Sequence, residues 1–166
     1  MLNFPVILGA ALVPTIIGFL YYNPKFGFGK AWMSASGVTE EMAKTGNMAV
    51  IFGVSLVLSI LLSIQLNFIT IHQGHLASIL LGEQGWGEEG SAVMTLYNDF
   101  MTSYGQNFRT FKHGALHGAL AGFFFALPIL GTNALFEHKG FKYIAINVGY
   151  WIITLALMGG VICRFA

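Results

Sequence analysis

The chain has 166 residues, of which 55% are hydrophobic and only 9% are charged. Soluble domains carry about 25% charged residues, so this chain has too few charges to cover a water-facing surface. Its length is that of one domain, residues 1–166. The net charge of +1 excludes a strongly basic surface for nucleic acid. A single cysteine, Cys163, excludes an internal disulfide and a metal site built from several thiolates.

Four stretches contain no Asp, Glu, Lys or Arg, and each reaches the roughly 20 residues that a helix needs to cross the bilayer. They span residues 4–22, 48–71, 113–136 and 143–163. Backbone polar groups must be paired within lipid, and the stretches lack the alternation of barrel strands, so helices are expected. The sequence therefore predicts an all-α membrane protein with four transmembrane helices in a bundle.

The first of these helices and the loop after it carry local signals. Pro14 lies within the first span and predicts a kink, because proline cannot donate a backbone hydrogen bond. Trp32 lies in a segment that we expect to form a short interfacial helix. Thr39 precedes Glu40 and Glu41, a pattern that is typical of a capped helix start.

Between the second and third spans, apolar residues recur three and four positions apart, as on one face of a helix. They are Val93, Tyr97, Phe100, Tyr104, Phe108 and Phe111. An amphipathic helix over about 91–112 is therefore predicted. It either lies on the membrane surface or covers the bundle, or it gates a cavity.

Small residues line one face of the third span. Gly114, Gly118 and Gly122 are four positions apart, and such stripes let two helix backbones approach closely in lipid. Gly159, in the last span, offers a partner for this stripe. The pattern leaves open whether the stripe packs within the chain or between protomers.

The basic residues predict the orientation in the membrane. The first and third loops hold five of them, against three on the opposite side. The two sets are Lys25, Lys30, Lys44, Lys139 and Lys142, against Arg109, Lys112 and Arg164. The excess predicts a multi-pass protein of the cell (inner or plasma) membrane with cytoplasmic first and third loops and both termini outside.

Four histidines lie at the ends of the second and third spans, near one membrane surface. His72 and His75 are three positions apart, and His113 and His117 are four apart. Imidazole binds transition metals and titrates near neutrality. Three interpretations stay open: hydrogen bonding to neighbouring backbone, handling of protons or a polar ligand, and a metal or haem site.

A second polar set is predicted near the opposite surface. Asn133 and Glu137 share a face of the third helix, and Asn147 and Tyr150 follow at the start of the fourth. Glu137 either pairs with a nearby lysine at the interface or forms the mouth of a polar path with Asn67, Asn133 and Asn147.

Short pieces along nearly the whole chain resemble the family of small membrane proteins known as domain of unknown function 1761. The pieces are Tyr22-Asn-Pro24, Phe28-Gly-Lys30-Ala-Trp32, His117-Gly118, Asn133, Phe136-Glu137, Asn147-Val-Gly149-Tyr150-Trp151 and Leu157-Met-Gly159. The resemblance implies a four-helix membrane protein. It implies no reaction, substrate or catalytic residue.

No phosphate-binding loop, dinucleotide fingerprint or hydrolase motif occurs, so an enzyme is the less favoured interpretation. The first hypothesis is a homo-oligomeric transport or channel-like protein. The second is a non-catalytic accessory subunit of a larger membrane complex. The third is a membrane protein that uses its histidines to handle protons, a metal or haem. The expected partners are the lipid bilayer and further protein subunits, and no other cofactor is predicted.

Overall fold

The computed structural model describes residues 2–166, and every regular element in that range is helical. The elements are α1 (Phe4–Ala10), α2 (Val13–Tyr21), α3 (Gly29–Ser36), α4 (Glu40–Thr45), α5 (Met48–Thr70), α6 (Gln73–Leu80), α7 (Ala92–Tyr104), α8 (Phe111–Ala121), the π-helical turn η1 (Gly122–Ala126), α9 (Leu127–Phe136) and α10 (Phe141–Phe165). Within residues 2–166, four helical stretches are long and apolar enough to cross a membrane. They are Phe4–Tyr21, Met48–Thr70, Phe111–Phe136 and Phe141–Phe165. The all-α fold class predicted from the sequence is confirmed.

Prolines interrupt two of the four spans. The first is broken between Ala10 and Val13, because Pro14 lacks the amide N–H and its ring crowds the preceding turn. The third contains the π-helical turn η1 directly before α9, in which Pro128 is the second residue. A π-turn shifts the hydrogen-bond pattern where proline cannot take part in it. The sequence predicted the first interruption as a kink and did not predict the second.

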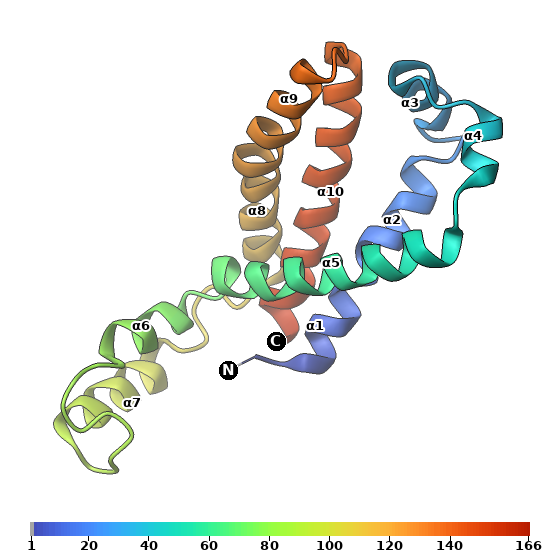
Figure 1. Cartoon of the computed structure of the whole chain (residues 1–166). Helices are drawn as coiled ribbons and strands as arrows, with labels where there is room; N and C mark the ends of the chain where they lie inside the picture. Colours follow the sequence, from blue (N-terminus) through green and yellow to red (C-terminus); the bar gives the residue numbers. More distant parts are fainter. Residues whose placement is uncertain (1) are drawn as a thin grey trace.

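α8 and α9 lie alongside α10, and the glycine stripe forms the seam between them (Figure 1). A Cβ atom on Gly114 would overlap the backbone of Gly159, and one on Gly118 would overlap the carbonyl of Leu155. At Gly122 the added Cβ would lie 2.6 Å from the Cα of Ile152. The stripe thus packs within the chain, at a separation that only glycine permits.

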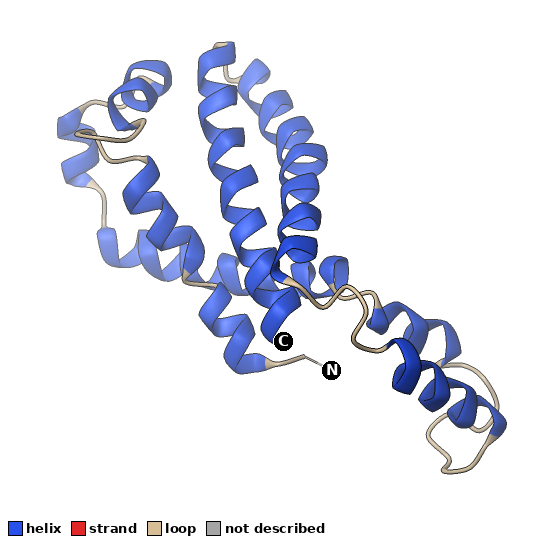
Figure 2. Ribbon diagram, turned by 180° about the vertical axis from the view of Figure 1, so that it is seen from behind, coloured by secondary structure: helices blue, strands red, loops and turns tan. Residues whose placement is uncertain are grey.

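α5 runs across the lower part of the α8–α10 pair instead of alongside it (Figures 1 and 2). Its buried residues all lie from its midpoint onward: Ser59, Ser63, Leu66, Asn67 and Thr70. Its first half is exposed and apolar, as at Val50 and Val54. Hydrophobicity makes a segment long enough to span but specifies no direction, so the sequence did not predict this crossing.

α6 and α7 form a hairpin that projects away from the other helices (Figures 1 and 2). The Ser91 side chain caps α7 by accepting a hydrogen bond from the Met94 amide. The helix ends at Tyr104, earlier than predicted, and Phe108 then adopts a left-handed backbone with a φ of 63°. Because this turn redirects the chain, only the end of the hairpin adjoins the spans. α7 therefore does not cover the bundle, which was one of the alternatives that the sequence left open.

The first and third loops lie at one end of the molecule, and the two termini lie toward the other (Figure 1). At one end the Lys139 ammonium donates to the carbonyl of Ser36, which joins the third loop to the first. There Thr39 caps α4, and hydrogen bonds to the carboxylate from the Glu41 backbone and the Thr39 side chain lower the pKa of Glu41. At the other end Asn3 donates to the carbonyl of Phe165.

Candidate functional site

Three of the four predicted histidines converge beside the end of α5. His72, His113 and His117 each offer a ring nitrogen, and these atoms all lie within 4.8 Å of one another. The Nε2 atoms of His72 and His113 are 2.9 Å apart, which is hydrogen-bond distance. The ring centroids are separated by 4.5–4.9 Å, and the ring planes are inclined by 57–81°. The rings therefore meet at their edges around a common point. We call these three residues the histidine cluster.

Two local features of the backbone bring the histidine cluster together. His113 and His117 are one turn apart on α8, so their side chains share a face. Thr110 sets the start of α8 by accepting a hydrogen bond from the His113 amide. α5 ends at Thr70, and Ile71 is extended, which turns the chain so that His72 faces α8.

His75 stands outside the cluster. Its ring centroid is 6.1 Å from that of His72, and His75 lies on α6, within the hairpin. The sequence-based prediction grouped all four histidines, because their spacing alone could not show that the helix breaks before His72. His75 thus provides a nearby histidine that is not part of the converging group.

The histidine cluster consists of imidazoles alone within the described residues, with no carboxylate in the group. Burial, and then the neighbouring His117 and His75, lower the pKa of His72. Desolvation disfavours the charged imidazolium, and positive neighbours disfavour it further. His72 is therefore neutral at physiological pH, which is the form that accepts a metal ion or a hydrogen bond.

Aromatic side chains flank the histidine cluster where the hairpin joins the spans. The Phe108 ring lies 5.1 Å from the His113 ring, and its left-handed backbone is unusual for a bulky residue. Phe100, Tyr104 and Phe108 line a cavity of about 430 Å³ that His72 also borders. This cavity would give a small molecule or ion access to His72.

The second predicted polar set is divided by the structure. Asn133, Glu137 and Asn147 line a cavity of about 120 Å³ near the α9–α10 turn. Tyr150 instead donates to the carbonyl of Pro14 at 2.8 Å. Asn67 is buried on α5 and does not line this cavity, and its Oδ1 has no hydrogen-bond partner among the described residues. The five residues therefore do not form one path.

Asn147 joins three parts of the chain. Its Oδ1 accepts hydrogen bonds from the Tyr22 hydroxyl at 3.0 Å and the Trp32 indole at 3.3 Å, and its Nδ2 donates to the carbonyl of Tyr143 at 2.8 Å. Burial, and then the neighbouring tyrosines, raise the pKa of Tyr22, so its hydroxyl stays protonated as a donor. These bonds hold the first loop against α10 and give a structural reason for the residues that carry the family resemblance.

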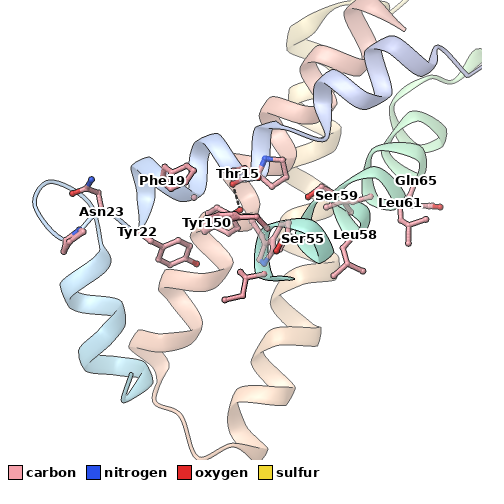
Figure 3. A pocket seen from close by; sticks show the side chains of 17 residues that line it. Thr15, Phe19, Tyr22, Asn23, Ser55, Leu58, Ser59, Leu61, Gln65 and Tyr150 are labelled. Atoms are coloured by element: carbon pink, nitrogen blue, oxygen red, sulfur yellow. Dashed lines mark hydrogen bonds between the residues drawn. The ribbon is translucent and has the colours of Figure 1, made fainter. Parts of the chain in front are cut away.

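A larger cavity, of about 920 Å³, lies between α2, α5 and α10 (Figure 3). We call it the groove. Thr15, Ser55, Ser59 and Tyr150 lie close together in its middle (Figure 3). Sequence analysis missed all of these except Tyr150. The four-residue spacing of Ser55, Ser59, Ser63 and Asn67 along the second span was the signal that could have revealed it.

One comparison with known proteins covers nearly all of this chain. The model of a family described as a protein of unknown function (DUF1761) matches residues 5–163, which include the histidine cluster and almost all of the four spans. No curated protein sequence and no solved structure matches the chain. Because the match covers nearly the whole chain, this protein belongs to the DUF1761 family.

Proposed function

We propose that this membrane protein binds one divalent transition-metal ion at His72, His113 and His117. The observation that carries the proposal is the convergence of three ring nitrogens within 4.8 Å of one another. Three nitrogens bound to a tetrahedral Zn²⁺ at 2.0–2.1 Å would lie about 3.3 Å apart. The His72–His113 pair, at 2.9 Å, would need to open only slightly.

The arrangement favours a single ion over haem. Two axial histidines would have to stand on opposite faces of a haem ring, whereas these rings meet at hydrogen-bond distance. Neutral imidazole suits zinc, copper and nickel, and three protein ligands leave a fourth position for water or a delivered ligand. The cavity beside His72 supports access to that position.

Of the functions considered from the sequence, metal handling gains the most support. The glycine stripe motivated the homo-oligomeric transporter or channel, but its three glycines already contact α10 of the same chain. An accessory subunit would need a dedicated partner surface, and no single feature of the described residues identifies one. The histidine cluster supports binding or transfer of a metal ion at one membrane surface.

A metal titration of the purified protein in mild detergent tests this proposal. We expect Zn²⁺ to bind in a ratio of one ion per chain, measured by competition with a chromophoric chelator and by elemental analysis. Metal content that shows no saturation, or that does not exceed that of an empty detergent control, would contradict it.

The affinity for Zn²⁺ should decrease as the pH is lowered. Protons compete with the metal for imidazole nitrogens, so affinity falls once the pH drops below the histidine pKa values. Because the pKa of His72 is lowered from the ordinary value of about 6.5, its contribution should persist into mildly acidic buffer. Repeating the titration across the range from neutral to acidic pH measures this, and an affinity that rises on acidification would refute imidazole ligation.

We also propose that the first and third loops face the cytoplasm, which puts the histidine cluster and both termini outside. The contact between Lys139 and Ser36 supports a shared side for the two lysine-rich loops. An impermeant thiol reagent added to intact cells should label Glu89→Cys and should not label Glu40→Cys, both in a Cys163→Ser background. Both tested positions are exposed, so the reverse labelling pattern would invert the topology.

A further inference from the structure

The groove combines an apolar wall with several uncharged polar side chains. It is lined by residues of α2, α5 and α10, and its volume of about 920 Å³ is that of a small-molecule site. Ser59 is the midpoint of α5, and Thr15, Ser55 and Tyr150 lie near it (Figure 3). Polar groups that face hydrocarbon are costly unless they are paired.

Several of these polar groups have nothing to pair with. The side chains of Ser55, Ser59 and Gln65 line the groove and make no hydrogen bond to any residue between 2 and 166. By contrast, the Thr70 hydroxyl, on the same helix, donates to the carbonyl of Leu66 at 2.8 Å. One turn beyond Ser59, the fully buried Ser63 hydroxyl also has no partner in the described chain. The α5 side of the groove therefore offers unused hydrogen-bonding groups.

The break in the first span adjoins the same place. Pro14 and Thr15, just after the break, both line the groove, and Tyr150 bonds the Pro14 carbonyl there. Interrupted membrane helices beside polar groups are a frequent feature of ligand sites in membrane proteins. The break between α1 and α2 therefore lies beside the unpaired hydroxyl groups of the groove.

The lining restricts the chemistry of an occupant. None of the residues that line the groove is Asp, Glu, Lys, Arg or His. A charged ligand would lose its hydration without gaining an opposite charge, which is strongly unfavourable in hydrocarbon. Phe19, Ile51, Phe52 and Leu58 form an apolar rim and are themselves exposed, so the groove opens toward lipid.

We propose that the groove binds an uncharged lipid that has an apolar chain and a hydroxyl group. The hydroxyl bonds Ser59 and its polar neighbours. The chain occupies the apolar remainder of the groove, between Phe19 and Leu58. The ligand enters sideways from the bilayer, so this site is separate from the histidine cluster and requires no metal.

Trp151 lines the groove and reports binding directly. The double variant Trp32→Phe/Trp86→Phe, reconstituted in nanodiscs, retains Trp151 as its only tryptophan. We expect a dibrominated octadecanol to quench the fluorescence of Trp151 in a saturable manner. Its methyl ether and the corresponding carboxylate should bind at least about 10-fold more weakly, the loss expected for one hydrogen bond or for a charge. Equal, non-saturating quenching by all three compounds would show ordinary bilayer lipid only and would overturn the proposal.

Two variants and one control test whether the quenching arises from binding in the groove. Gly18 faces it, and an added Cβ would meet only Tyr150, at 3.7 Å from the hydroxyl, so Gly18→Leu should fill the groove and abolish saturable quenching. Gly53→Leu is the matched control, because a Cβ there meets nothing within 4 Å and Gly53 does not line the groove. Ser59→Ala, which changes little volume, should weaken the alcohol about 10-fold and leave the ether unchanged. Unchanged alcohol binding in Ser59→Ala would overturn the proposal even if Gly18→Leu failed to fold.

Discussion

Replacing His117 with alanine should lower the affinity of the protein for Zn²⁺ by about 100-fold or more, since even an indirect partner of a metal ligand contributes 10–100-fold. His117 is one of three converging imidazoles, so its loss leaves only two protein ligands. The competition titration described above measures this loss. His113→Ala should have an effect of similar size, because both residues present their rings from the same face of α8.

His75→Ala is the matched control for this experiment. His75 is nearby but lies outside the converging group, so its removal should change Zn²⁺ affinity by less than about 10-fold, the lower limit for an outer partner of a ligand. Equal losses in His75→Ala and His117→Ala would indicate nonspecific surface binding. If His117→Ala lowered thermal stability in metal-free buffer but left Zn²⁺ affinity unchanged, the cluster would have only a structural role.

The second large effect is expected at the seam between α8 and α10. Gly118→Ala should destabilise the protein by about 3 kcal/mol, the upper part of the range for overpacking. The added Cβ would overlap the carbonyl of Leu155, and backbone cannot move aside as the end of a flexible side chain can. The two helices would have to separate along the seam. Thermal unfolding followed by circular dichroism in detergent measures the change.

Gly9→Ala and Gly53→Ala are matched controls, because each makes the same glycine-to-alanine substitution within a helix. A Cβ at either position meets nothing within 4 Å, so no overlap opposes the substitution. Within a helix, alanine is more favourable than glycine by about 1 kcal/mol. These variants should therefore unfold at the same temperature as the unaltered protein or at a slightly higher one. A Gly118→Ala protein as stable as these two would show that the close seam is not required.

Segment length and charge placement were sufficient to predict the helices. The third and fourth spans extend only slightly beyond their predicted ends, because charged residues and turns limit how far an apolar helix can run. Thr39 caps α4 and Pro14 interrupts the first span, as predicted, because capping and proline sterics depend on immediate neighbours. The π-helical turn was missed because it arises from Pro128 within an otherwise continuous apolar segment.

The sequence by itself determined that this is an all-α protein with four apolar spans, and it indicated histidines near one end of two of them. Such properties depend on composition and local spacing. Only the tertiary structure decided that His72, His113 and His117 meet while His75 does not, because a two-residue break after α5 sets the direction of His72. It likewise decided that the glycine stripe contacts α10 of the same chain and that α5 crosses to open the groove. Packing partners depend on the shapes of distant segments, which a pattern of hydrophobic residues does not encode.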